Sequence, residues 1–145
     1  MLTIQQNRLE EQDTLLATDS AIDLRFPGGL LGFENIKHYK LHAFPDLHPY
    51  LWLEGQDGTD QCFLVVPPSF VVDGYQIDIS EDDVKFLGLR SPDDAVVLNV
   101  ATFYPDGSIT VNLKGPIIYN KHELIARQVV PKNAPDLAIK HPLGN

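Results

Sequence analysis

The stretch that decides the fold is Ile109-Thr-Val-Asn-Leu-Lys-Gly-Pro-Ile-Ile-Tyr-Asn120. Its first five residues alternate between apolar and polar side chains, which is the period of a strand with one buried face. Gly115-Pro116 interrupts this period, because proline has no N–H to donate and glycine tolerates torsions that other residues avoid. The last residues are again β-prone and end at a turn residue. The stretch predicts two strands joined by a kink or bulge, as at a barrel corner. One central strand with a break is the alternative.

Immediately before this stretch, the run from Ala95 to Tyr104 is almost continuously apolar. Continuous apolar character over the length of a strand is typical of a strand that is buried on both faces. Pro105-Asp-Gly107 then supplies residues that favour a turn. The sequence therefore predicts a hairpin that leads into Ile109.

Shorter β-prone runs, separated by proline, glycine and aspartate, predict further strands. They lie at residues 14–17, 21–26, 39–42, 50–54, 61–66, 70–72, 75–79 and 123–130. The first two runs flank a turn-prone segment and predict a hairpin or a bulged strand. Asp57-Gly58 predicts a short hairpin, because a tight β-turn needs residues that accept positive φ angles.

A glycine-rich segment lies between the strands predicted at 21–26 and 39–42. Pro27-Gly-Gly29 and Gly32 predict a tight loop, and Leu30, Leu31 and Phe33 are expected to tuck beneath it. A phosphate-binding loop would need a Gly-Lys-Ser/Thr ending in a strand-to-helix context, and this segment lacks both. We therefore predict no phosphate site here.

One helix is predicted after residue 80. The Ser80 side chain can accept hydrogen bonds from the free N–H groups of a first helical turn. Glu81, Asp82 and Asp83 then lie at the positive end of the helix dipole, and Gly88 can end the helix. One short helix among many strands cannot form a layer of its own.

Together these signals predict a mainly β, single-domain, antiparallel β-barrel-like fold with one short helix. The 145 residues suffice for one domain with a sizeable core. Residues 1–13 are polar and are expected to form a flexible N-terminal arm, either frayed or a short helix. Residues 14–145 are expected to form one β-domain.

The chain is acidic, with 11 lysine and arginine residues against 20 aspartate and glutamate residues and a net charge of −9. Such a surface repels phosphate backbones, which argues against direct nucleic-acid binding, and it favours basic partners. Solubility alone is the alternative explanation. Lone Cys62 lies in a strand-like run, so we expect a buried structural thiol in a reducing compartment. No membrane span or signal peptide is evident, and we expect a cytoplasmic protein.

No catalytic, metal-binding or cofactor-binding residue is predicted. The five histidines are scattered along the chain. His38 and His42 are four residues apart, a spacing that makes a ligand pair only on a helix, and this run is predicted to be a strand.

Residues 73–94 are strongly acidic, with seven acidic and two basic side chains and a local net charge of −5. One interpretation is a docking surface for a basic protein, where charge would raise the association rate. The other is helix capping and solubility. The candidate partner-binding residues are Asp73, Asp78, Glu81, Asp82 and Asp83, together with Phe33 and Glu34 in the glycine-rich loop. The alternative for Phe33 is a place in the core, where phenylalanine is more often found.

Seven segments, in order, resemble the bacterial flagellar assembly factor FliW family and cover about residues 22–143. They are Phe26-Pro-Gly-Gly-Leu-Leu-Gly-Phe-Glu34, Pro49-Tyr-Leu-Trp-Leu-Glu54, Phe63-Leu-Val-Val-Pro67, Leu87-Gly-Leu-Arg-Ser-Pro-Asp-Asp-Ala95, Thr110-Val-Asn-Leu-Lys-Gly-Pro-Ile-Ile-Tyr-Asn120, Arg127-Gln-Val-Val130 and Ile139-Lys-His-Pro142. The family often has proline where Leu31 stands in this chain.

The resemblance implies a cytoplasmic, mainly β protein that is not an enzyme. It implies that the protein binds newly made flagellin and, once flagellin is exported, binds the RNA-binding translational repressor CsrA and so relieves repression of flagellin synthesis. A small β-barrel enzyme or a small-molecule-binding domain is the alternative, and either would need a concave pocket with convergent polar groups.

Overall fold

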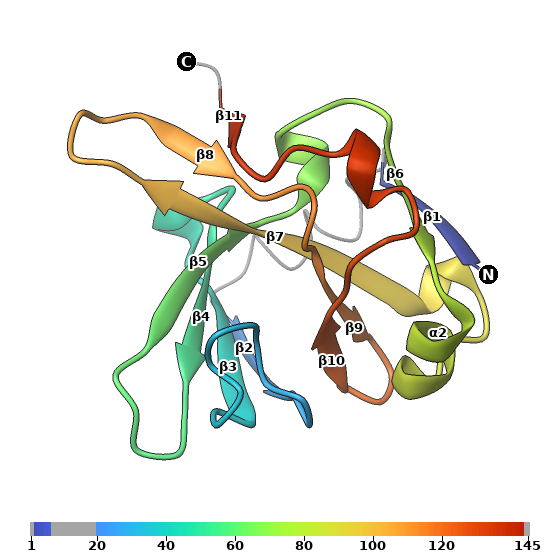
Figure 1. Cartoon of the computed structure of the whole chain (residues 1–145). Helices are drawn as coiled ribbons and strands as arrows, with labels where there is room; N and C mark the ends of the chain where they lie inside the picture. The colour runs from blue at the N-terminus through green and yellow to red at the C-terminus, as the bar shows by residue number, and fades with distance from the viewer. Residues whose placement is uncertain (1, 7–19, 144–145) are drawn as a thin grey trace.

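The computed structural model describes residues 2–6 and 20–143 of the chain (Figure 1). Their strands are β1 (Leu2–Gln6), β2 (Ser20–Arg25), β3 (His38–Ala43), β4 (Leu51–Gly55), β5 (Cys62–Val66), β6 (Tyr75–Ile79), β7 (Ala95–Phe103), β8 (Ile109–Val111), β9 (Ile117–Asn120), β10 (Ala126–Gln128) and β11 (His141–Pro142). The one α-helix within these residues is α2 (Glu81–Leu87). Short 3-10 helices occupy Pro45–Leu47, Pro68–Phe70, Pro92–Asp94 and Ala134–Asp136.

The strands form one large antiparallel sheet and one two-stranded sheet. The large sheet has the order β10-β9-β7-β5-β4-β3-β2, with β8 paired to β7 and β11 paired to β8. Its two end strands approach each other where the Arg25 N–H donates to the Leu124 carbonyl at 3.0 Å. The sheet is therefore barrel-like without a continuous closing ladder. The predicted fold class is confirmed.

Strand β7 crosses the whole molecule and organises it (Figure 1). Its first half pairs with β9, from Ala95 opposite Asn120 to Leu98 opposite Ile117, and its last three residues pair with β8. This confirms the hairpin and the two strands predicted around Gly115-Pro116. The kink is held by Asn112, whose Oδ1 accepts from the N–H groups of Lys114 and Gly115 at 3.0 Å each.

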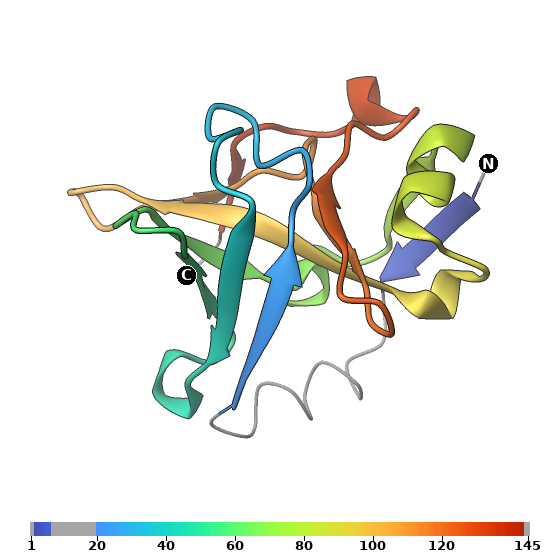
Figure 2. The ribbon, with the colours of Figure 1, turned by 90° about the horizontal axis from the view of Figure 1, so that it is seen from below.

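Two hydrophobic cores lie on the two faces of β7, which explains its continuous apolar sequence. Alternate residues of a strand point to opposite faces, so Val97 enters one core and Leu98 the other. The first core lies beneath α2, β1 and β6, which sit together at one side of the molecule (Figure 2). The second lies inside the curved sheet and includes Leu24, Phe26, Tyr39, Leu41, Leu53, Val65, Ile117 and Tyr119.

Several local predictions are wrong. Leu2–Gln6 form a strand antiparallel to β6, where a frayed arm or short helix was expected, because Ile4 is buried against the first core. Residues 70–72 form the end of a 3-10 helix and the turn after it, and they do not form a strand. Leu31 is 81% exposed and does not tuck beneath the loop, and Cys62 is only half-buried. The strand predicted at 14–17 lies outside the described residues.

Candidate functional site

Four of the five acidic residues predicted to bind a partner lie at or near the start of α2, and Asp73 lies at the far end of β6. The N–H of Asp83 donates to Ser80 Oγ at 3.1 Å, and the Ser80 hydroxyl lies 3.0 Å from Asp83 Oδ2. The predicted N-cap is therefore confirmed. It places Glu81, Asp82 and Asp83 in the first helical turn, where the helix dipole favours negative charge.

Arg127 of β10 joins this helix to the sheet. Its Nη1 lies 3.1 Å from Asp83 Oδ1 and 3.7 Å from Asp82 Oδ2. The guanidinium carbon also lies 4.1 Å from the centre of the Phe86 ring, a cation–π geometry. The Asp83 side chain is only 15% exposed, whereas that of Asp82 is 89% exposed. Asp83 therefore stabilises the contact between α2 and β10, whereas the Asp82 side chain projects into solvent.

The other acidic candidates divide in the same way. Asp78 is half-buried, and its Oδ1 accepts a hydrogen bond from the Thr3 hydroxyl at 2.9 Å. This contact ties β6 to β1. Asp73 and Glu81 are exposed, as Asp82 is. The structure thus leaves Asp73, Glu81 and Asp82 as the exposed members of the predicted acidic set.

The loop that carries Phe33 and Glu34 is tightly closed. Gly29 has φ +66°, and a Cβ there would lie 2.5 Å from the Glu34 Cα, so only glycine fits. The Gly32 N–H donates to the Glu34 carboxylate at 3.0 Å and holds the pKa of Glu34 below its ordinary value. Phe33 is half-buried, with its ring 5.1 Å from the ring of Phe63.

This loop and α2 contact opposite faces of β10. The Leu31 N–H donates to Oε1 of Gln128 at 3.0 Å, whereas α2 contacts the preceding residue, Arg127. Successive side chains of a strand point to opposite faces. The structure therefore does not bring Phe33 and Glu34 together with the acidic residues of α2.

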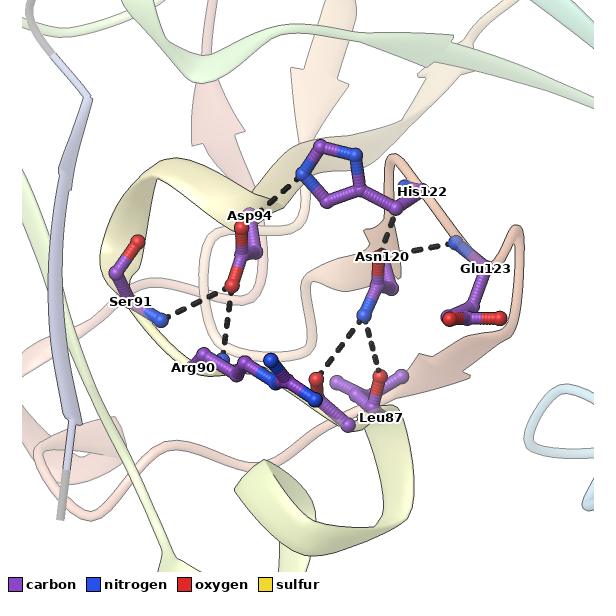
Figure 3. Close-up of polar contacts among 8 residues, drawn as sticks. Leu87, Arg90, Ser91, Asp94, Asn120, His122 and Glu123 are labelled. Carbon is purple, nitrogen blue, oxygen red and sulfur yellow. Dashed lines mark hydrogen bonds and ion pairs between the residues drawn. The ribbon is translucent and has the colours of Figure 1, made fainter.

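Sequence reasoning missed an open hollow of about 830 Å³ at the other end of α2. Asn120 lies in its wall with 2% of its surface exposed. The Asn120 amide Nδ2 donates to the carbonyls of Leu87 at 2.9 Å and Gly88 at 3.2 Å (Figure 3). Its Oδ1 accepts from the N–H groups of His122 at 2.8 Å and Glu123 at 3.1 Å. One buried side chain thus joins the end of α2 to the β9–β10 turn.

Asp94 forms the opposite wall of the hollow. Its Oδ2 accepts from the N–H groups of Arg90 at 2.8 Å and Ser91 at 3.0 Å, and its Oδ1 lies 3.1 Å from His122 Nε2 (Figure 3). The two backbone N–H groups, and after them His122, hold the pKa of Asp94 below its ordinary value. The carboxylate is therefore ionised at neutral pH, and its charge is compensated from within the protein.

A signal that could have indicated this region is the pattern Ser91-Pro-Asp-Asp94, which has the spacing of a capping box. Asn120 was visible only as a turn residue. Its role depends on Leu87, which is 33 residues away in the sequence. No local pattern encodes such a contact.

Comparison with known proteins gives the chain a family. The family model described as FliW protein matches residues 3–143. The chain belongs to the FliW family. A flagellar assembly factor FliW from Natranaerobius thermophilus is 34% identical over 125 residues, which are 84% of this chain and 82% of the relative. One from Leptospira biflexa is 32% identical over 120 residues, 81% of this chain and 78% of the relative.

A solved FliW structure has the same fold. The crystal structure of the flagellar assembly factor FliW superposes with a TM-score of 0.75 and 26% identity, over 85% of this chain and 86% of that chain. The family resemblance inferred from the seven segments is therefore confirmed.

Two further observations concern this FliW family member. Among residues 2–6 and 20–143, no group of three or more His, Cys, Asp and Glu side chains is arranged to hold a metal ion. The same part of the chain contains no helix with the length and apolar character needed to cross a membrane.

Proposed function

We propose that this FliW family member binds flagellin and, when flagellin has been exported, binds the translational repressor CsrA instead. Capture of CsrA relieves repression of flagellin synthesis, so that synthesis follows export. The protein acts in the cytoplasm by protein–protein binding and turns over no substrate. Membership of a family of flagellar assembly factors is the observation that carries this proposal.

The charge of the chain supports the choice of CsrA. A repressor that binds RNA must present a basic surface to phosphates. This chain carries a net charge of −9, and Glu81 and Asp82 are exposed at the start of α2, whereas the exposed Asp73 lies at the far end of β6. Complementary charge of this kind raises association rates and excludes wrong partners. We therefore assign CsrA binding to the α2 acidic surface, defined as Glu81 and Asp82.

The hollow beside Asn120 is the observation that favours the alternative, a small-molecule-binding domain or enzyme. Its volume lies within the range of ligand sites. The Asn120 amide and the Asp94 carboxylate in its walls, however, already form hydrogen bonds with backbone groups of the same protein. The Asp94 carboxylate, which is held in this way, is poorly placed to act as a general base that abstracts a proton from a substrate.

The test is binding of the purified protein to purified flagellin and to CsrA, followed by isothermal titration calorimetry at 50 mM and 500 mM NaCl. We expect a complex with each partner, a CsrA affinity that falls with salt because exposed charges are screened, and displacement of CsrA by flagellin. No complex with either protein at low salt would overturn the proposal. A metabolite retained in the hollow would favour the alternative.

A further inference from the structure

The hollow at the C-terminal end of α2 differs in charge from the rest of the molecule. Lys85 and Arg90 line it, and both side chains are exposed. Within residues 2–6 and 20–143, neither the Lys85 ammonium nor the Arg90 guanidinium has a hydrogen-bond or ion-pair partner. Two uncompensated cations therefore face one hollow in a chain with a net charge of −9.

The negative groups at this end of α2 are largely occupied. The Asp94 carboxylate is bound by two backbone N–H groups and by His122. The last helical carbonyls, of Leu87 and Gly88, accept from the Asn120 amide. Glu123 is the remaining carboxylate of the lining, and in Figure 3 it lies across Asn120 from Arg90. The lining thus has two cations and two carboxylates, but on the α2 side the hydrogen-bond donors of the two cations are not used by the described part of the chain.

The same side of the hollow also has an apolar part. Val84, which is half-buried, and Leu89, which is 7% exposed, contribute to the lining beside the two cations. A site that combines an apolar surface with a few fixed polar groups is the usual arrangement of a binding pocket. Arg90 can bind a carboxylate through two parallel hydrogen bonds, and Lys85 adds a point charge.

We propose that this hollow is a second docking site, which binds an acidic segment of a protein partner. A carboxylate of that segment lies between Lys85 and Arg90, and a neighbouring apolar side chain packs against Val84 and Leu89. The α2 acidic surface at the other end of the helix selects a basic partner, so the two ends of one helix recognise groups of opposite charge. This inference does not depend on the identity of either partner.

The test uses the full chain, labelled with 15N, and a blocked acidic peptide, acetyl-Ala-Asp-Leu-Glu-Ala-amide, followed by NMR. We expect the peptide to shift the backbone amide signals of Gly88, Leu89 and His122. The double variant Lys85→Glu/Arg90→Glu is expected to weaken binding by about tenfold or more, because charge-assisted hydrogen bonds are replaced by repulsion. The wild-type protein is expected to bind the peptide with asparagine and glutamine in place of its acidic residues as weakly as the double variant binds the acidic peptide.

The matched control is Lys132→Glu/Lys140→Glu, which makes the same change in net charge at two exposed lysines outside the lining. We expect this control to keep most of the affinity and both variants to keep the wild-type Tm, since all four side chains are exposed. The proposal is overturned if the wild-type protein shows no peptide-dependent shifts at low salt. It is equally overturned if the two variants lose affinity to the same extent, or if the shifts map elsewhere.

Discussion

The two ends of α2 are built in different ways. At the N-terminal end, Ser80 caps the helix through Asp83, only three residues away. At the C-terminal end, Gly88 adopts φ +68°, and the helical carbonyls are bound by Asn120, which is 33 residues from Leu87. The N-cap is local, although Arg127 of β10 also binds Asp83, whereas the carbonyls of Leu87 and Gly88 depend on a residue far away in the sequence. The comparison teaches that substitution of the exposed acidic residues should cost little stability. Substitution of the buried residue in the wall of the hollow, Asn120, should destabilise the fold.

The largest expected effect is at the C-terminal end. Asn120→Ala removes four hydrogen bonds of one buried side chain and is expected to lower the free energy of unfolding by about 3 kcal/mol. Chemical denaturation measures this loss. The control is Asn35→Ala, at an exposed asparagine. An equal effect of both substitutions would show that the second end of α2 is not held as described.

A smaller effect is expected at the N-terminal end. Ser80→Ala removes the acceptor for the Asp83 N–H and is expected to cost about 1 kcal/mol, the usual value for a lost N-cap. Ser80→Thr keeps the hydroxyl and should restore most of the stability. If Ser80→Ala costs as much as Asn120→Ala in the same denaturation assay, the contrast between the two ends fails.

The smallest expected effect concerns pH. The pKa of Asp94 is lowered in the folded protein, chiefly by the N–H groups of Arg90 and Ser91. A lowered carboxyl pKa contributes stability that is present above the unfolded pKa, near 3.9, and is lost as pH falls through the folded pKa. The stability advantage of the wild type over Asp94→Asn should therefore shrink as pH falls below about 4. Unfolding curves from pH 6 to pH 2.5 measure this difference, and a constant difference would contradict it.

The sequence predicted the features that depend on neighbouring residues. The Ser80 cap and the Gly88 end of α2 are found, as is the turn at Asp57-Gly58, whose φ angles are 65° and 79°. The alternation around Ile109 and the apolar run of β7 correctly predicted the hairpin and the central strand. In each case the signal is a local pattern with one structural solution.

The failures involve contacts between distant segments. Pairing of β1 with β6 joins residues 75 positions apart, and the sparse apolar residues of β1 give no period by themselves. For the same reason, composition could not separate Asp83, which binds Arg127 of β10, from the exposed Asp82 beside it. The hollow was missed because its walls come from α2, the segment before β7 and the β9–β10 turn.

The division between Asp82 and Asp83 decides how the acidic surface should be tested. Reversal of charge at both positions would also remove the contact between the Ser80 hydroxyl and the Asp83 carboxylate and the contact with Arg127, so slower binding could reflect a damaged helix. Asp82→Lys alone changes a side chain that is 89% exposed. Asp60→Lys, at an exposed position in the β4–β5 loop, makes the same change in net charge and is the matched control.

The most direct test of the proposed function is the association rate with CsrA at low salt, measured by stopped-flow fluorescence for these two variants. We predict that Asp82→Lys slows association about two- to fivefold, because it places a positive charge within the docking surface, while Asp60→Lys changes the rate much less. Equal rates for the two variants, or no association with CsrA at all, would contradict the account.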